Sequence, residues 1–326
     1  MGTSHVSELF SILDDASLII RKYKKTSYLQ ALCMAAAQIV EDRADAGDED
    51  ANRRLLVLYG HFFKQGMTGE DVRRAFQLAV LKGMKQEEDK TEGMTADVVV
   101  LLAGHLASLL FGQRHALVVD PAVGTANLLT GVMNQLNSAD GCGADNDEVA
   151  IALAFASANL QQREIHLLHQ DGLRPLLVAP ADLVVSEPPD GVYQDADVSA
   201  GYALHAVGQQ ADAPFLFIEQ GLRILKFGGY LLYVIPNRLF AEDRDKVFYK
   251  YAAQHADILA LLQLPQSLFQ HAEAAKSIML LQKKDGVGRP PKETLLAELP
   301  DFTNTAALGA AIRRIDRWFA NTGLDE

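Results

Sequence analysis

The sequence predicts an α/β fold in which a helical N-terminal domain precedes a seven-stranded, mostly parallel sheet of the doubly wound type. Apolar residues of the first ninety or so positions recur at steps of three and four, which is typical of helices. After Gly93, short apolar runs alternate with amphipathic stretches, which is typical of strands and crossover helices. The length of 326 residues agrees with two domains at roughly 150 residues each. We therefore predict a helical domain over residues 1–92 and a sheet domain with a C-terminal helical tail over residues 93–326.

Three amphipathic helices follow one another in the predicted N-terminal domain. The first two have apolar stripes formed by Leu29, Leu32, Cys33, Ala36 and Val40, and by Leu55, Tyr59, Phe62 and Phe63. A third helix is predicted after Thr68, because Thr68 followed by Asp71 resembles a capping box. The acidic stretch Glu41–Asp50 is predicted as a loop, and the charged stretch Lys85–Gly93 as the domain boundary.

Seven apolar runs are predicted as the strands of the sheet. They are Ala116–Asp120, Gly141–Asp145, Ile165–His169, Asp182–Val185, Tyr230–Ile235, Ile258–Leu264 and Ser277–Gln282. Helices between most of them imply parallel strands with both faces covered. Because no convincing helix separates the last two runs, the final strand is expected to run antiparallel to its neighbours. A Gly/Pro-rich break at Gly286–Pro291 then precedes a closing helix around Ala306–Phe319.

Composition and charge exclude several classes of protein. Hydrophobic residues make up 49% and charged residues 22%, which excludes a disordered chain. The formal net charge of −12 argues against a protein that coats nucleic acid by charge alone, although a local basic groove stays open. With two cysteines and no CxxC, neither a disulfide framework nor a cysteine-rich zinc site is predicted. No secretory signal begins the chain, and the apolar window Val98–Phe111 is too short to span a bilayer. We therefore expect a cytoplasmic protein with no membrane partner and no metal site.

A glycine turn follows the first predicted strand, where Asp120-Pro121-Ala122-Val123-Gly124 leads into a helix. Ligands of doubly wound sheets bind at the carboxyl ends of the strands, near the point where the strand order reverses. The turn is neither GxGxxG nor a P-loop, because one glycine remains and no GK[ST] follows. Cofactors held by a pyrophosphate are therefore disfavoured. For the glycine alone, a plain tight turn of an α/β fold is the alternative.

Three acids, Asp120, Asp145 and Asp171, end three consecutive predicted strands. Asp145 stands 25 residues after Asp120, near the spacing at which an acid binds ribose hydroxyls. Either of the later acids alone is more often a helix cap or a turn residue. Together the three predict a row of carboxylates along one edge of the sheet. Such a row suits a ligand with a cationic amino-acid end, a ribose and an adenine, and S-adenosyl-L-methionine has all three.

The segment from Asp120 to Leu129, DPAVGTANLL, resembles the DPxxGTGNLL motif of class I methyltransferases related to the amino-group adenine DNA methylases. The branch that it resembles most is that of the YtxK-like proteins. Further matches are Met94-Thr95, Gly143–Asp147, Gln170–Gly172, Phe215–Phe240, Leu264–Phe269 and Ser277–Leu281. The resemblance covers about Met94–Lys284, while the helical front and the tail match only the YtxK-like branch. It implies a Rossmann-like methyltransferase fold with S-adenosyl-L-methionine as cofactor.

The resemblance also implies how the cofactor is held. Asp120 and Gly124 would contact its methionyl end, Asp145 its ribose hydroxyls, and Asp171 its adenine amino group. The full cofactor-binding set that it implies is Thr95, Asp120, Pro121, Ala122, Gly124, Asn127, Asp145, Asn146, Asp171 and Gly172. Ala126 departs from the glycine that is usual in the motif. Its methyl group is tolerated if the residue is already helical, and otherwise weakens the affinity for the cofactor.

An altered acceptor motif follows the fourth predicted strand, where the family has [DNS]-Pro-Pro-aromatic. In the family, an amino group attacks the sulfonium methyl directly, while a side-chain acceptor and a backbone carbonyl bind the amino hydrogens. The prolines hold that carbonyl inward. The catalytic residues that the resemblance implies are Ser186, Glu187, Pro188 and Pro189, with the carboxylate of Glu187 as the acceptor.

Asp190 stands at the aromatic position of this motif and cannot stack on a flipped base. Tyr193 lies three residues further on and is a candidate replacement. A rigid loop whose catalytic role has lapsed is one alternative for the altered motif, and a changed substrate is the other.

The leading hypothesis from the sequence is an S-adenosyl-L-methionine-dependent methyltransferase that acts on an amino group or a similar nucleophile. Nucleic acid is a partner by resemblance. However, the net charge of −12 and the short tail of about forty residues after the last strand, too short for a recognition domain, disfavour sequence-specific DNA methylation. One rival is a catalytically silent cofactor-binding protein that uses its helical front for docking. A second is a dinucleotide oxidoreductase, which the missing GxGxxG disfavours. A homodimer is one assembly that this hypothesis allows.

Overall fold

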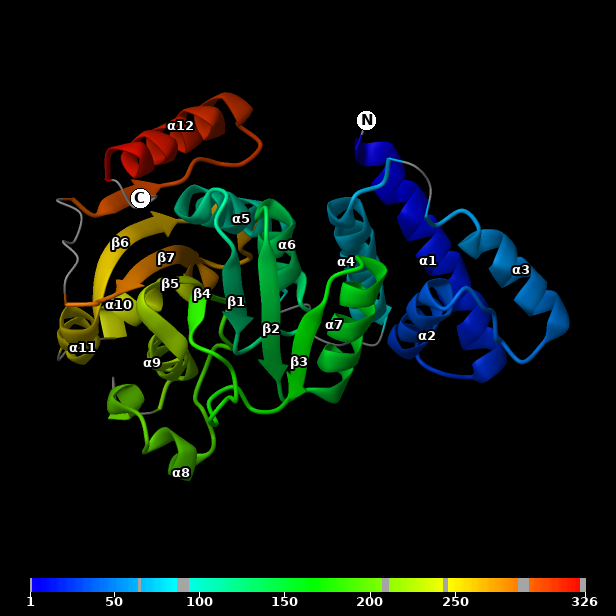
Figure 1. Cartoon of the computed structure of the whole chain (residues 1–326), viewed down its shortest axis with the longest axis horizontal. Coiled ribbons are helices and arrows are strands. Elements are labelled where there is room, and N and C mark those ends of the chain that lie inside the picture. Colours follow the sequence, from blue (N-terminus) through cyan, green and yellow to red (C-terminus); the bar gives the residue numbers. More distant parts are fainter. Residues whose placement is uncertain are drawn as a thin grey trace.

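A computed structural model describes residues 2–63, 66–86, 94–206, 211–242, 246–286 and 293–322, which form a helical region beside a mixed α/β region (Figure 1). The helices of the first region are α1 (Gly2–Lys24), α2 (Tyr28–Val40), α3 (Glu49–Tyr59) and α4 (Gly69–Gln86). The strands of the second are β1 (Ala116–Asp120), β2 (Ala139–Asp145), β3 (Ile165–His169), β4 (Ala181–Ser186), β5 (Leu225–Pro236), β6 (Ala256–Gln263), β7 (Lys276–Lys283) and β8 (Leu295–Glu298). Its helices are α5 (Asp97–Phe111), α6 (Asn127–Gln135), α7 (Glu148–Leu160), α8 (Ala196–Ser199), α9 (Ala213–Ile224), α10 (Arg238–Glu242), α11 (Val247–His255) and α12 (Thr305–Thr322), with short 3₁₀ turns at Ala203–Ala206, Gln266–Leu268 and Ala272–Ala274.

Side-chain caps fix where the N-terminal helices begin. Asp48 caps α3 by accepting a hydrogen bond from the backbone N–H of Ala51, so α3 begins within the predicted loop Glu41–Asp50. The predicted capping box before α4 is present, since Thr68 and Asp71 accept hydrogen bonds from each other's backbone N–H at 3.0 and 3.1 Å. The predicted boundary Lys85–Gly93 runs into residues 87–93, which lie outside the described residues.

The sheet has eight strands in the order β3-β2-β1-β4-β5-β7-β6-β8. The predicted number of seven is therefore wrong by one: all seven predicted strands are present, and β8 pairs with β6 at the edge of the sheet. All neighbouring pairs are parallel except those of β7, which is antiparallel to β5 and β6. The predicted reversal of the seventh strand is thus confirmed. The strand order reverses between β1 and β4, so the switch point lies at their carboxyl ends.

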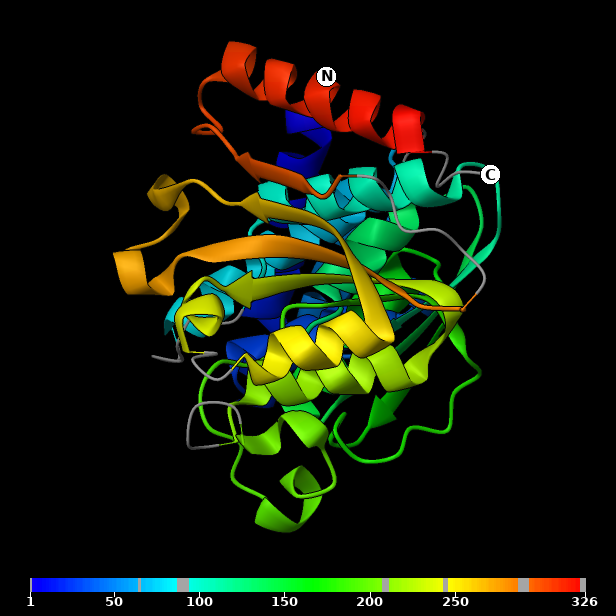
Figure 2. The same cartoon turned by 90° about the vertical axis from the view of Figure 1, so that its left-hand side faces the viewer.

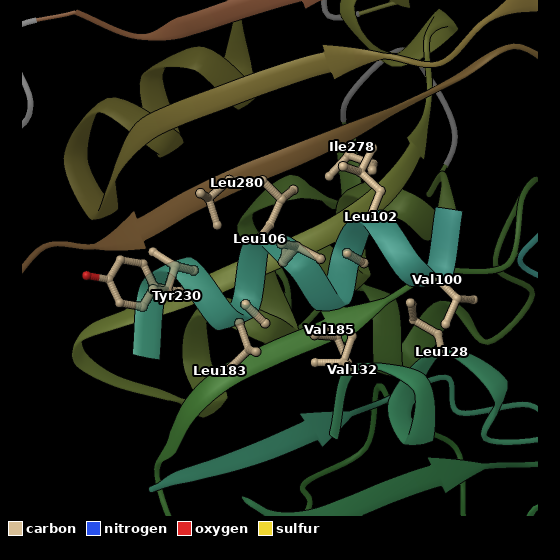
Figure 3. Packing of buried hydrophobic residues seen from close by; sticks show 14 of the residues in the cluster. Val100, Leu102, Leu106, Leu128, Val132, Leu183, Val185, Tyr230, Ile278 and Leu280 are labelled. Carbon is tan, nitrogen blue, oxygen red and sulfur yellow. The ribbon is translucent and has the colours of Figure 1, made fainter. Parts of the chain in front are cut away.

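Alternate residues of the strands enter two separate cores. On β5, Tyr230 and Leu232 face the core shared with α5, α6 and α12, whereas Leu231 and Tyr233 face the core shared with α9 and α11. Figure 2 shows these helices as layers on opposite faces of the sheet. Figure 3 shows Leu102 and Leu106 of α5 packed over strand residues such as Leu280. Burial of one such leucine stabilises the fold by about 1.5–3 kcal/mol.

Helix α5 is the most apolar of the longer helices that the structure describes, and it is buried against the sheet. This packing accounts for the apolar window Val98–Phe111 of the sequence. Among the described residues, no helix has both the length and the apolar character needed to cross a membrane.

Candidate functional site

The three predicted acids lie at one edge of the sheet. Asp120 and Asp145 are the last residues of the parallel neighbours β1 and β2, and Asp171 follows β3 by two residues. Parallel strands place their carboxyl ends at the same edge. One hydrogen bond links the turn after β1 to the end of β2, because the backbone N–H of Gly124 donates to Asp145 Oδ2 at 2.8 Å.

Asp120 is a buried carboxyl group at the switch point, with 1% of its surface exposed. Its Oδ1 accepts hydrogen bonds from the hydroxyl of Ser186 at 2.8 Å and from the backbone N–H of Ala122 at 3.0 Å. Ser186 is the last residue of β4, so this bond joins the two strands that flank the switch point. Burial raises the pKa of Asp120 to about 7, even though both hydrogen bonds lower it. The hydroxyl of the predicted catalytic residue Ser186 is thus hydrogen-bonded to Asp120, a predicted cofactor-binding residue.

The glycine turn is held close to β2 and open on its other side. Asp145 accepts a second backbone hydrogen bond from the N–H of Asp147, while its neighbour Asn146 is exposed. Gly124 has a φ of +52°, in the region that favours glycine, and no described atom lies within 4 Å of the place where a Cβ would stand. The turn therefore leaves free space beside Gly124.

Ala126 has a φ of +60° and a ψ of 20°, which is the left-handed conformation. It is the residue before α6 and is fully buried in the core. The condition that would make its methyl group harmless, a helical backbone, is therefore not met. Steric crowding disfavours this conformation for alanine by about 1–2 kcal/mol, and burial of its methyl group offsets part of that cost at about 0.8 kcal/mol.

Asp171 and Gly172 form the third side of the site. Asp171 Oδ1 accepts a hydrogen bond from the backbone N–H of Leu173 at 2.9 Å, and the hydroxyl of Tyr193 donates to its Oδ2. A Cβ on Gly172 would lie 1.7 Å from the carbonyl oxygen of Pro121, so the turns after β1 and β3 are in direct contact. Tyr193 is thus hydrogen-bonded to Asp171, the predicted adenine-binding residue, and its use as a base-stacking group stays a prediction.

The acceptor loop is held by two basic residues that the sequence analysis missed. Glu187 forms an ion pair with Lys276, the first residue of β7, through Oε1. Its Oε2 is buried and accepts no hydrogen bond from any residue that the structure describes. Pro188 beside it is buried, and Pro189 is exposed.

The second missed residue, Arg238, forms ion pairs with Asp190 and Asp212. A charged pair thus stands where the family has an aromatic side chain. Lys276 begins β7 and Arg238 begins α10, just after β5, and local sequence patterns connect neither residue to the predicted acceptor motif. The signal that could have found Lys276 is the reversed final strand, because an antiparallel strand begins at the edge where its neighbours end.

A small cavity connects the two halves of the site. It has a volume of about 30 Å³ and is lined by Met94, Thr95, Asp120, Ala122, Val123, Gly124, Thr125, Asn127, Leu128 and Glu187. Thr95 and Asn127 are joined by a hydrogen bond from Asn127 Nδ2 to the carbonyl of Thr95, at 3.1 Å. A larger cavity of about 520 Å³ lies between the loop after Gly172 and α9, and its lining contains no Asp or Glu. Of these two cavities, we take the small one as the candidate site, because only its lining contains carboxylates. Within the described residues, no group of three or more His, Cys, Asp or Glu side chains could hold a metal ion.

Comparison with known proteins gives two family matches that together cover most of the chain. Residues 81–301 match the N-6 DNA methylase family, and residues 7–84 match the YtxK N-terminal helical domain. The uncharacterized protein YtxK of Bacillus subtilis (strain 168) is 36% identical over 325 residues, which are 98% of this chain and 99% of that protein.

Solved structures similar to this fold include two methyltransferases. A putative class I S-adenosylmethionine-dependent methyltransferase from Listeria monocytogenes is 34% identical, with a TM-score of 0.86 over 97% of this chain and 99% of that one. The methyltransferase subunit of a type I restriction-modification system from Streptococcus thermophilus has a TM-score of 0.64 at 16% identity, over 92% of this chain and 73% of that one. The second likeness concerns the fold alone.

Proposed function

The chain belongs to the N-6 DNA methylase family, and on that premise we propose that it is an enzyme that methylates an amino group or a similar nucleophile with S-adenosyl-L-methionine. The observation that carries this proposal is the row of Asp120, Asp145 and Asp171 at one edge of the sheet. We assign the methionyl end to the turn at Asp120 and Gly124, the ribose to Asp145, and the adenine to Asp171. Oδ2 of Asp120 accepts none of the hydrogen bonds described above, and each carboxylate oxygen of Asp145 and Asp171 accepts one and keeps a second lone pair, so these contacts have room.

The residues at the site fit this cofactor. Open space beside Gly124 allows close approach to the backbone. Helix α6 begins beside the cavity with no side-chain hydrogen bond to its first N–H groups among the described residues. A helix N-terminus of this kind binds a carboxylate such as that of the methionyl end. The row of acids at the edge of the sheet provides the negative charge that the ammonium group of the methionyl end requires.

The cavity of about 30 Å³ is far smaller than the roughly 300–1,000 Å³ of sites that hold small molecules. A nucleoside therefore has to displace side chains that now close the site. Tyr193 is the residue to move first, because its hydroxyl already occupies Asp171. The cofactor-binding roles of Pro121, Ala122, Asn146 and Gly172 are, in this proposal, to shape the turns that surround the nucleoside.

On the acceptor side, the bound cofactor would supply a sulfonium methyl group that is open to direct displacement. Glu187 Oε2 lacks a donor among the described residues and is therefore the group that we expect to bind an amino hydrogen of the acceptor. Lys276 holds the other oxygen and thereby fixes the carboxylate. Pro188 and Pro189 restrict the backbone beside it. Glu187 is also placed to hold the proton that the acceptor nitrogen loses.

The same ion pairs favour a second candidate function, a cofactor-binding protein that has lost catalysis. Lys276 pairs with Glu187, and Arg238 pairs with Asp190. Glu187 and Asp190 stand at the two motif positions that would contact the acceptor in the family. In that case the cofactor would still bind, and no acceptor would be methylated. Nucleic acid remains one of the acceptors to test.

The free state of Cys33 and Cys142 agrees with a reducing cytoplasm.

Calorimetry and methyl transfer separate these functions. We expect S-adenosylmethionine to give heat on binding, and no heat at high micromolar cofactor would exclude the proposal. Methyl-labelled cofactor incubated with DNA, RNA, protein and cell extract should label one class of acceptor, and binding without labelling supports the silent protein. The Glu187→Gln variant should lose methyl transfer by about 100-fold or more with cofactor binding intact. The exposed Glu298→Gln on β8 is the matched control. Unchanged turnover in Glu187→Gln would remove its assigned role.

A further inference from the structure

Arg73 is a fully buried arginine on α4, with 1% of its surface exposed. Its guanidinium group binds Glu70 twice, at 2.8 Å from Nε and at 2.6 Å from Nη2, and it also pairs with Asp97. Its Nη1 donates to Asn127 Oδ1. These partners come from α4, from the first turn of α5 and from the first residue of α6. One side chain therefore joins the helical region to the two helices that begin beside the cavity.

The hydrogen bonds continue from Arg73 into the wall of the cavity. Asn127 accepts a hydrogen bond from Arg73 through Oδ1 and donates one through Nδ2 to the carbonyl of Thr95. Gln77, one turn after Arg73 on α4, donates to the same carbonyl at 3.2 Å. Thr95 and Asn127 both line the cavity together with Asp120 and Glu187. The position of this wall is thus set from the helical region as well as from the sheet.

The packing around Arg73 is tight enough to make this connection rigid. A Cβ on Gly131 of α6 would lie 2.1 Å from a methyl carbon of Val100 and 3.3 Å from Arg73 Nε. The absence of a side chain at Gly131 therefore lets α4, α5 and α6 approach one another. A buried guanidinium held by carboxylates on two sides has no alternative arrangement of similar energy, because each broken ion pair would leave a charge without a partner.

We propose that Arg73 is a positioning residue of the cofactor site, through which the helical region sets the affinity for the cofactor. This inference rests on the proposed function, since it concerns the same cavity. Arg73 does not contact the cofactor in this proposal. It holds Asn127 and, through Asn127 and Gln77, the carbonyl of Thr95, so that the wall is already in place when the cofactor binds. An ordered wall raises affinity because less disorder is lost on binding.

The test is S-adenosylmethionine binding by calorimetry to the full chain and three variants, well below their melting temperatures. Arg73→Met should raise the dissociation constant about tenfold, as expected when hydrogen bonds to a charged group are lost. Gln77→Met is a milder variant that removes the donor to Thr95 and the hydrogen bond at 3.4 Å that Gln77 Oε1 accepts from Arg73 Nη1, while the ion pairs of Arg73 stay in place. It should raise the dissociation constant about threefold. Arg74→Gln is the matched control, because Arg74 pairs with Asp97 from the solvent side at 3.0 Å and should leave affinity unchanged.

Hydrogen exchange separates positioning from general loss of stability. In Arg73→Met, backbone amides of residues 94–97 and 124–128 should exchange faster, while those of β4 and β5 keep their protection. Uniformly faster exchange, or wild-type affinity in a folded Arg73→Met, would overturn the inference. If Arg73→Met does not fold, Gln77→Met decides, and wild-type affinity there overturns it equally. If the unmodified chain binds no cofactor, the proposed function fails, and the exchange measurement still tests what Arg73 holds.

Discussion

A carboxylic acid shielded from water resists ionisation, and Asp120 is in this position at the head of the glycine turn. Burial is the largest cause that raises its pKa to about 7, and the charges of Asp145 and Glu187 act in the same direction. Because this pKa lies above that of an unfolded chain, near 4, the stability that the group contributes is complete below about pH 4 and is lost as the pH rises through about 7. A cation bound beside Asp120 offsets the free-energy cost of ionising this buried group, since it favours the ionised form.

We therefore predict that the affinity for S-adenosylmethionine rises with pH. Between about pH 6 and pH 8 the dissociation constant should fall about tenfold, because a ligand that requires ionised Asp120 loses about tenfold per pH unit below its pKa. Calorimetry near pH 6.5, in buffers with different ionisation enthalpies, should show that binding releases protons. Asp120→Asn removes this ionisation, so proton release should disappear. Proton uptake in the wild-type protein would contradict the assignment.

At the residue scale, the sequence was sufficient for side chains whose position follows from the end of a strand. The three acids lie together because parallel strands end at a common edge, which a strand assignment already implies. Lys276 and Arg238 were missed because their partners lie far away in the sequence, and for Arg73 the same is true of its link to the cavity wall. Arg73 and Asn127, for example, are 54 residues apart. Ala126 was anticipated only as a departure, since no local pattern shows a left-handed backbone.

The elements of the site meet through their turns, and Gly172 is the tightest of these contacts. Gly172→Ala should destabilise the protein by about 3 kcal/mol, because its methyl group would overlap the carbonyl of Pro121 and backbone atoms cannot yield cheaply. Cofactor binding should be lost at the same time, since the turns after β1 and β3 would separate. Chemical denaturation and calorimetry measure the two effects.

Gly60→Ala provides the control for this substitution. An added methyl group there would make an ordinary contact at 3.5 Å with the carbonyl of Leu56. Its effect on stability should stay within about 0.5 kcal/mol, as is usual for surface positions. A Gly172→Ala variant as stable as Gly60→Ala would show that the two turns are not in firm contact.

Among the elements, the long and periodic ones were predictable and the short edge strand was not. The four residues of β8 follow a Gly/Pro-rich break, and their pattern is too short to indicate a strand. Pairing with β6 defines this strand, and such pairing is a tertiary contact. The reversal of β7 was predictable for the opposite reason, because a parallel crossover needs a connection of about a dozen residues or more, usually a helix, and no helical pattern precedes it.

The whole molecule has a core that crosses from the helical region into the sheet region. Leu153, Ala156 and Leu160 of α7 belong to the same buried cluster as residues of α1–α4. Figure 1 shows α7 between β3 and the N-terminal helices. The face of α7 that contacts α2 would be exposed without the helical region. The division of the chain into two domains at residue 92 thus stays a prediction, and the two parts share an apolar core.

We predict that the chain unfolds in urea as one cooperative unit, because separating the two regions would expose this shared core. Trp318, the single tryptophan of the sequence, packs on the sheet core from α12 and reports the C-terminal region by its fluorescence. Far-UV circular dichroism reports the helices of both regions, so the two transitions should coincide. Leu153→Ala should shift both curves together by about 2–5 kcal/mol, the usual cost of such a core truncation. Leu296→Ala, at a position that is 61% exposed, should change little. Two separate transitions, or a Leu153→Ala effect confined to one probe, would show that the regions unfold independently.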